Sequence, residues 1–241
     1  MVKSRKLSIV IPVYNEEKFV EETIKRVMLQ KVKYFKYKEV IVVNDGSTDS
    51  TGKILNKLKT KYKDKLQVIN KKVNQGKGAA LKDGFKKTTG DVVIVQDADL
   101  EYSPSDYDIL LEPFVEHNAD VVYGSRLNIY RPHRVMYFWH SVANNILTTF
   151  SNMFTNLNLS DMETGFKCFG GDLIRKIAPE IRSKRFGFEP EITARIAKIK
   201  GIRFYEVGIS YEGRTYEEGK KIGWKDGVKA FWEVIKYNLL D

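Results

Sequence analysis

The sequence predicts an α/β fold in which a central, mostly parallel sheet is covered by helices on both faces. Short runs that are almost entirely apolar and β-branched alternate with longer amphipathic stretches through the first half of the chain. This is the pattern of a parallel sheet whose two faces are both buried. The chain has 241 residues, of which 42% are hydrophobic, so it is long enough and apolar enough to bury a substantial core.

Strands and helices are expected to alternate through the first half. The strands are expected at residues 7–13, 39–43, 66–69, 91–95 and 119–123. The helices between them are expected at 16–30, 50–62, 76–87 and 105–116, where apolar residues recur with the helical period. In such sheets ligands bind beyond the carboxyl ends of the strands. We therefore expect the loops 12–17, 44–49, 73–78 and 97–101 to share one crevice.

The second half of the chain changes character. Further helices are expected at 135–154, near 172–177, and at 189–200 and 224–240, with a strand at 203–209. No internal repeat, low-complexity block or Pro/Ser-rich linker separates the two halves. We therefore expect residues 1–241 to form a single domain with a first half, 1–126, and a second half, 127–241.

Composition narrows the class of protein. The single cysteine, Cys168, excludes an internal disulfide framework and a cysteine-rich zinc site. The start MVKSRK is not followed by the apolar segment of a signal peptide, and no run reaches the ~20 apolar residues of a membrane span. A cytoplasmic protein, at most attached to a membrane surface, is expected. The net charge of +10 suggests anionic partners, although the lysines between residues 53 and 72 resemble the solvated face of a helix.

Three carboxylates follow the expected strand at 91–95. Asp97, Asp99 and Glu101 are spaced one residue apart. In extended backbone alternate side chains point the same way, so the three carboxylates are expected to converge on a hard divalent cation with oxygen ligands. The alternative is a solvated acidic turn in which Asp99 or Ser103 caps the next helix.

A second ligand-type loop follows the strand at 39–43. Asp45 precedes Gly46, which permits a tight turn and a close ligand approach. The Asp45 carboxylate can accept hydrogen bonds from a base NH or a ribose hydroxyl, and Tyr14 of the first loop is suited to cover a base. The chain has no G-x-G-x-x-G after its first strand and no G-x-x-x-x-G-K-[ST], so neither a Rossmann dinucleotide site nor a P-loop is expected.

The ordered motifs resemble a known family. PVYNEE, VVNDGSTDST, NQGKGAALKDG, QDADLE, VVYGSR, METGFK, FGFEPEI and GRTYEEGKKIGWKDG occur in this order. Together they cover essentially the whole chain and resemble family-2 glycosyltransferases of the GT-A fold, a Rossmann-like fold that binds nucleotide-diphosphate sugars. The subgroup that they resemble is that of the dolichyl-phosphate mannose and glucose synthases and their bacterial polyprenyl-phosphate relatives. The resemblance implies a first half that binds the nucleotide sugar and a second half that binds the acceptor.

The resemblance also implies a set of site residues. It assigns the donor nucleoside to Pro12, Tyr14, Glu16, Val43 and Asp45, and the diphosphate with its metal, Mg²⁺ or Mn²⁺, to Asp97, Ala98 and Asp99. Glu101 stands where many relatives have a glutamine metal ligand. Arg126, Arg214 and Lys220 match phosphate-contacting positions, and with Asp99 they form the expected catalytic set. Arg131 joins Arg126 and Arg214 as a candidate for the acceptor phosphate, in a segment that varies. Gly219 replaces the serine that relatives have before the lysine.

The chemistry expected from this resemblance is an inverting transfer of a hexose to a polyprenyl or dolichyl phosphate. A phosphate acceptor is already anionic, with a second pKa near ~6, so it needs cations and no strong base. A hydroxyl acceptor on a glycan, lipid or small molecule would instead need a carboxylate base, for which Asp161, Glu163, Glu189 and Glu191 are available. A non-enzymatic nucleic-acid-binding module is a further alternative, and it is disfavoured because no nucleic-acid-binding motif occurs.

The stretch 135–154 has an apolar face. Val135, Phe138, Trp139, Val142, Ile146, Thr149 and Phe150 recur at helical spacing. Such a face, combined with net positive charge, suits a surface at the interface of an anionic membrane. It is equally suited to packing on the domain core or on a second subunit.

Overall fold

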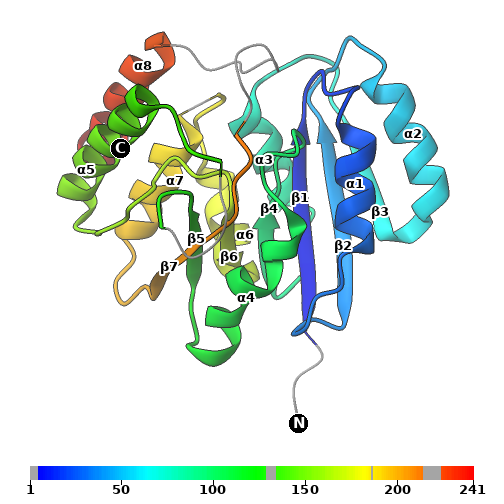
Figure 1. Ribbon diagram of the computed structural model, residues 1–241, viewed down its shortest axis with the longest axis horizontal. Coiled ribbons are helices and arrows are strands. Elements are labelled where there is room, and N and C mark those ends of the chain that lie inside the picture. The colour runs from blue at the N-terminus through cyan, green and yellow to red at the C-terminus, as the bar shows by residue number, and fades with distance from the viewer. Residues whose placement is uncertain (1–4, 129–133, 186, 214–223) are drawn as a thin grey trace.

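A computed structural model describes residues 5–128, 134–185, 187–213 and 224–241 of the chain. Among these residues, seven strands form one sheet in the order β3-β2-β1-β4-β6-β5-β7 (Figure 1). The strands are β1 (Lys6–Val13), β2 (Tyr37–Asn44), β3 (Leu66–Asn70), β4 (Val92–Val95), β5 (Val121–Ser125), β6 (Lys167–Gly170) and β7 (Phe204–Gly208). All neighbouring pairs are parallel except those that β6 makes with β4 and β5. The predicted α/β class with a mostly parallel sheet is confirmed.

The α-helices of the described part are α1 (Val20–Leu29), α2 (Thr51–Tyr62), α3 (Lys77–Phe85), α4 (Tyr107–Glu116), α5 (Phe138–Thr155), α6 (Gly171–Ile177), α7 (Phe188–Ala197) and α8 (Trp224–Ile235). Short 3₁₀ turns cover Lys63–Lys65, Pro104–Asp106 and Ala178–Glu180, and a π-helical turn, Lys236–Leu240, follows α8. Each helix lies within a few residues of its predicted position. The largest differences are at α1, where a turn at residues 17–19 precedes the helix, and at α8, which ends at Ile235 and is followed by the π-helical turn.

Strand β6 was not expected, because its four residues, KCFG, are too few to show a period and lack the β-branched run that marks the equally short β4. It runs antiparallel between β4 and β5, pairing Ile94 with Cys168 and Val122 with the same residue. Strand β5 also begins two residues later than predicted and extends to Ser125, which pairs with Gly208 of β7. Through β6, strands from the two halves of the sequence form one continuous sheet.

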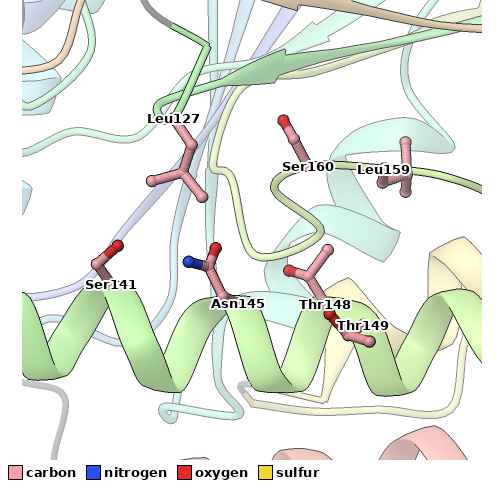
Figure 2. A pocket seen from close by; sticks show the side chains of 7 residues that line it. All are labelled: Leu127, Ser141, Asn145, Thr148, Thr149, Leu159 and Ser160. Atoms are coloured by element: carbon pink, nitrogen blue, oxygen red, sulfur yellow. The ribbon is translucent and has the colours of Figure 1, made fainter.

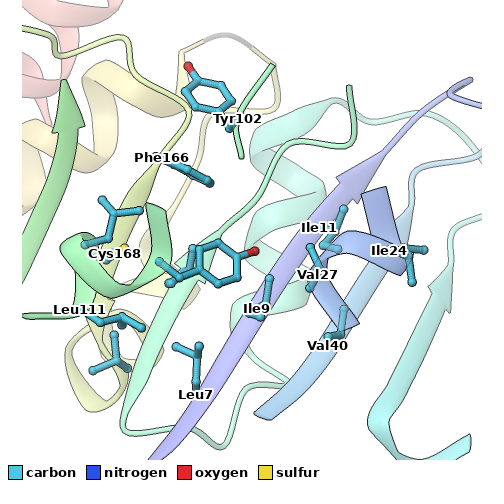
Figure 3. Close-up of a cluster of buried hydrophobic side chains, with 14 of the residues drawn as sticks. Leu7, Ile9, Ile11, Ile24, Val27, Val40, Tyr102, Leu111, Phe166 and Cys168 are labelled. Atoms are coloured by element: carbon cyan, nitrogen blue, oxygen red, sulfur yellow. The ribbon is translucent and has the colours of Figure 1, made fainter. Parts of the chain in front are cut away.

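Both faces of the sheet are buried, and successive residues of β1 alternate between them. Leu7, Ile9 and Ile11 lie in the cluster on the side of α1, α2 and α4 (Figure 3). Val10 lies in the other cluster, with residues of α3, α5, α6, α7 and α8. This two-sided burial is the reason why the strands are apolar at nearly every position. Cys168 is buried in the first cluster as a small apolar residue.

Candidate functional site

The loops after β1 and β2 are tied together by hydrogen bonds. The backbone N–H of Asn15 donates to Ser47 Oγ at 3.0 Å, and that of Glu17 donates to Asp49 Oδ2 at 3.2 Å. Asn15 has a left-handed backbone with φ of 52°, a conformation that asparagine tolerates better than most residues. These contacts place the first two predicted loops side by side.

The Asp45 carboxylate ties the second loop to the third. It accepts hydrogen bonds from the backbone N–H of Gln75, at 3.0 and 3.1 Å, and of Gly76, at 2.6 Å. Lys71 Nζ lies 2.8 Å from its Oδ1 and exposes only 10% of its side chain. The lysines of residues 53–72 were expected to form a solvated face, and for Lys71 this expectation was wrong, because its side chain is largely buried against Asp45. Asp45 itself is only 2% exposed, so its contact with a nucleoside stays a prediction.

Lys77 joins the third loop to the fourth and to α7. Its Nζ lies 3.0 Å from Asp97 Oδ1 and 3.1 Å from Glu189 Oε1. Burial by itself would lower the pKa of Lys77, but the two carboxylates outweigh it and raise this pKa above its ordinary value. Sequence reasoning had not assigned Lys77 a role. The available signal was a lysine that follows a glycine at the first residue of a helix facing the expected crevice.

The fourth loop differs from the expected extended arm. Strand β4 ends at Val95, and Leu100 has a left-handed backbone with φ of 65°. Asp97 forms an ion pair with Lys77, while Glu101 Oε2 accepts a hydrogen bond from Tyr211 Oη at 3.0 Å. In the described part of the chain no three acidic, histidine or cysteine side chains are grouped to hold a metal. The backbone therefore departs from the extended arm on which the convergence was argued, because the chain turns at Leu100, and the role of the three carboxylates as cation ligands stays a prediction.

The alternative, a capped acidic turn, is partly realised. Ser103 Oγ accepts a hydrogen bond from the backbone N–H of Ser105 at 3.3 Å and caps the turn Pro104–Asp106. Asp99 lies outside this cap, and its Oδ1 accepts from the backbone N–H of Glu101 at 3.2 Å. The oxygen donors of Asp97, Asp99 and Glu101 still lie on one half-buried loop. Their chemistry fits a hard divalent cation such as Mg²⁺ or Mn²⁺.

Arg126, directly after β5, is held by a buried ion pair. Its Nε and Nη2 donate to the two oxygens of Asp161 at 2.6 and 2.7 Å, and its backbone N–H donates to Oδ2 at 3.0 Å. Asp161 is fully buried, which would raise the pKa of its carboxyl, but Arg126 outweighs burial and lowers it. Glu206 of β7 supports the pair by accepting from the backbone N–H groups of Ser160 and Asp161.

The four candidate bases have different surroundings. Asp161 is paired with Arg126 and Glu189 with Lys77, and Glu191 bonds Arg195, one helical turn further along α7, at 2.8 Å. Glu163 differs from them, because its Oε1 is buried and has no hydrogen-bond partner among the described residues. Burial, reinforced by the nearby Glu189, raises the pKa of Glu163 to about 8.

The remaining predicted donor residues differ in how far they are exposed to solvent. Tyr14 is 39% exposed, and Pro12 and Glu16 are partly exposed. Val43 packs in the core, and Ala98 is 4% exposed with its carbonyl accepting from Thr23 Oγ1 at 3.0 Å. These two residues can reach a ligand only through their backbones. Arg131, Arg214 and Lys220 lie outside the described residues.

A hollow of about 440 Å³ lies between α5, the residue after Arg126 and the loop that follows α5 (Figure 2). It is lined by Leu127, Ser141, Asn145, Thr148, Thr149, Leu159 and Ser160. Asn144, next to one lining residue, accepts from Arg126 Nη2 at 3.2 Å. Sequence reasoning had not predicted this hollow, because it forms only where α5 packs against loops from elsewhere in the chain.

The mostly parallel sheet, with polar loops joined by hydrogen bonds beyond the carboxyl ends of its strands, defines an α/β fold of the GT-A class. Residues 8–178 match the family described as Glycosyl transferase family 2. The chain therefore belongs to glycosyltransferase family 2, as its motifs indicated.

Two named relatives extend over nearly the whole chain. One is the UDP-N-acetylglucosamine–dolichyl-phosphate N-acetylglucosaminyltransferase of Methanococcus voltae, 25% identical over 241 residues, covering 94% of each protein. The other is the dolichyl-phosphate β-glucosyltransferase ALG5A of Trichomonas vaginalis, 28% identical over 95% of this chain and 72% of the relative.

A solved structure shares the fold. The glucosyl-3-phosphoglycerate synthase of Mycobacterium tuberculosis, in complex with Mn²⁺, UDP and phosphoglyceric acid, has a TM-score of 0.71 at 17% identity. The match covers 98% of this chain and 79% of that one. At this identity the likeness concerns the fold.

Proposed function

We propose that this protein is an inverting, metal-dependent glycosyltransferase that moves a hexose from a nucleotide-diphosphate sugar, of the UDP-glucose or GDP-mannose type, to a polyprenyl or dolichyl phosphate. The observation that carries the proposal is the closeness of two charged groups. Tyr211 contacts both Glu101, at 3.0 Å, and the Arg126 guanidinium, 5.4 Å from its ring centroid. An acidic loop suited to a cation and a diphosphate thus lies one side chain away from an arginine suited to a phosphate. The names of the two relatives support the lipid-phosphate acceptor.

The charge of each proposed site residue indicates its role. Asp97, Asp99 and Glu101 would hold the divalent cation, which would stabilise the negative charge that builds on the departing diphosphate. Lys77 holds Asp97 in place and adds positive charge beside the same loop. Arg126, together with Arg131, Arg214 and Lys220, would offset the repulsion between two phosphorylated substrates. Pro12, Tyr14, Glu16, Val43, Asp45 and Ala98 would position the nucleotide.

A donor and acceptor screen tests this function. The full chain is incubated with Mg²⁺ or Mn²⁺ and with UDP-glucose, GDP-mannose or UDP-GlcNAc, against a short polyprenyl phosphate. We expect one donor to give glycosylated lipid phosphate with inverted anomeric configuration, and excess EDTA to stop the transfer. Transfer that continues undiminished in EDTA would contradict the metal, and the absence of product with every donor would contradict the acceptor.

One observation favours a hydroxyl acceptor as the second candidate. Glu163 is a carboxyl without a hydrogen-bond partner at Oε1 in the described part, with a pKa raised to about 8, as a general base near neutral pH requires. In that case the rate of transfer to a sugar hydroxyl should rise with pH up to about 8, as Glu163 loses its proton. Glu163→Gln should abolish this transfer. Transfer to a lipid phosphate, which needs no base, should persist in Glu163→Gln.

The acceptor implies contact with a membrane surface, for which α5 is suited. No helix in the described ranges is long and apolar enough to cross a membrane. One side of α5 packs inward, as the core-packing alternative predicted: Leu147 is buried, and the ring of Phe150 lies against Phe231 of α8 with centroids 5.3 Å apart. The other side exposes 69% of Phe138 and 75% of Trp139. We propose that this exposed part rests on the anionic cytoplasmic face of a membrane.

Vesicle binding tests the membrane contact. The wild type should co-sediment with anionic phosphatidylserine vesicles at low salt, and the double change Phe138→Ser/Trp139→Ser should reduce binding severalfold, because it removes interfacial aromatic area. Leu29→Ser is the control, since Leu29 is 69% exposed on α1. Equal loss in the control variant, or no vesicle binding by the wild type, would contradict the proposal.

A further inference from the structure

Tyr211, just beyond β7, occupies a junction between the two charged groups of the site. It is 5% exposed, and its Oη donates to Glu101 Oε2 at 3.0 Å. The face of its ring lies 5.4 Å from Arg126 Cζ, within the range of a cation–π contact. On another side its ring packs against Tyr102 with centroids 5.5 Å apart. A single side chain thus contacts both the acidic loop and the buried arginine.

Backbone contacts fix the place of Tyr211 independently of its hydroxyl. Its carbonyl accepts from the backbone N–H of Arg134 at 2.8 Å, and the backbone N–H of Glu212 donates to the carbonyl of Glu101 at 3.0 Å. Gly213 folds over the ring so closely that a Cβ there would lie 2.7 Å from Tyr211 Cε1. Arg134 Nη1 closes the turn by donating to the carbonyl of Gly213 at 3.0 Å. Removing the hydroxyl should therefore leave the segment in place.

The hydroxyl has a specific effect on Glu101. The carboxylate follows Leu100, which turns the chain through a left-handed conformation, and a glutamate side chain has several rotatable bonds. Donation from Tyr211 Oη to Oε2 selects one orientation of the carboxylate. Hydrogen bonds of this kind to metal-binding carboxylates typically change metal affinity about 10- to 100-fold.

We propose that Tyr211 is a positioning residue that orients the Glu101 carboxylate toward a divalent cation through its hydroxyl and supports the Arg126 guanidinium through its ring. The inference rests on the proposed function, because it takes Glu101 as a cation ligand. The hydroxyl acts on the donor side of the site through Glu101, and the ring acts on the acceptor side through Arg126, which also interacts with the hydroxyl.

Two variants of Tyr211 test these two roles. Tyr211→Phe should weaken binding of Mn²⁺ in the presence of UDP or GDP about 10-fold, measured by electron paramagnetic resonance of the free ion, with a smaller effect on the acceptor KM than Tyr211→Leu has. Tyr211→Leu should weaken Mn²⁺ binding equally and also raise the acceptor KM severalfold. Tyr205→Phe is the matched control, since it removes a hydroxyl from the edge strand β7, where the ring stacks on His117.

A double-variant cycle distinguishes positioning from general packing. In a Glu101→Ala background the change Tyr211→Phe should weaken Mn²⁺ binding no further, because its target is gone. Mn²⁺ binding by Tyr211→Phe equal to the wild type, or a full additional loss in the Glu101→Ala background, would overturn the positioning role while the proposed function stands. If the wild type binds no Mn²⁺ with either nucleotide and transfers no sugar, the proposed function itself fails. Thermal unfolding verifies that each variant is folded.

Discussion

Asp99→Ala is expected to abolish sugar transfer while the protein stays folded. Asp99 is half-buried on the loop after β4, and its Oδ1 accepts a hydrogen bond from the backbone of its own loop, at Glu101. The apolar core does not depend on it. Loss of a carboxylate that holds the cation and diphosphate removes the charge stabilisation of the leaving group, so we expect transfer to fall at least ~1000-fold. Transfer, Mn²⁺ binding and the unfolding temperature are to be measured on the same preparation.

Asp97→Ala should have the same effect on transfer and should also disturb Lys77. Asp97 also holds Lys77, and its removal leaves that ammonium with Glu189 alone. We therefore expect the fold to persist in both variants, with a larger drop in unfolding temperature for Asp97→Ala. Asp64→Ala, an exposed aspartate in the turn after α2, is the control and should transfer like the wild type. Near-normal transfer by Asp99→Ala would refute the assignment of this loop.

The fold could be predicted because each strand and helix carries its own periodicity. Near-continuous apolar runs predicted a sheet buried on both faces, and Leu7 and Val10 do lie in opposite core clusters. The order of the elements then placed four polar loops at one edge, where hydrogen bonds such as those of Asp45 to Gln75 and Gly76 join them. Local pattern was sufficient for these features.

The features that could not be predicted from the sequence are details of the backbone and contacts between residues far apart in the chain. Strand β6 is too short to show a period, and nothing in the local sequence indicated the left-handed turn at Leu100. Lys77 and Glu189 lie on opposite halves of the sequence, so their ion pair is set by the way α3 and α7 pack. Spacing indicated which residue types gather in the crevice, while tertiary packing decides which charges neutralise one another.

Because tertiary packing gives Arg126 a buried partner, changing Arg126 is expected to affect stability as well as transfer. The family resemblance implies an arginine that contacts the acceptor phosphate, so that Arg126→Ala would reduce transfer more than it reduces nucleotide binding. In the structure its partner, Asp161, is fully buried, and removing the guanidinium leaves an unpaired carboxylate in the interior. Breaking a buried ion pair in this way costs roughly 3–5 kcal/mol. Arg126→Ala should therefore lower the free energy of unfolding as well as transfer.

A set of paired variants separates the two effects. The double change Arg126→Ala/Asp161→Ala should recover much of the stability that Arg126→Ala loses, because no unpaired charge remains, yet it should not recover transfer to a polyprenyl phosphate. Arg203→Ala is the matched control: its ion pair with Asp120 has the same kind of geometry at 2.8 Å but is exposed, and an exposed pair is worth at most about 1 kcal/mol. Denaturant unfolding measures the stabilities and the lipid-phosphate assay measures transfer. If the double variant regained transfer together with stability, Arg126 would serve the fold alone, and the acceptor phosphate would have to be held by other cations.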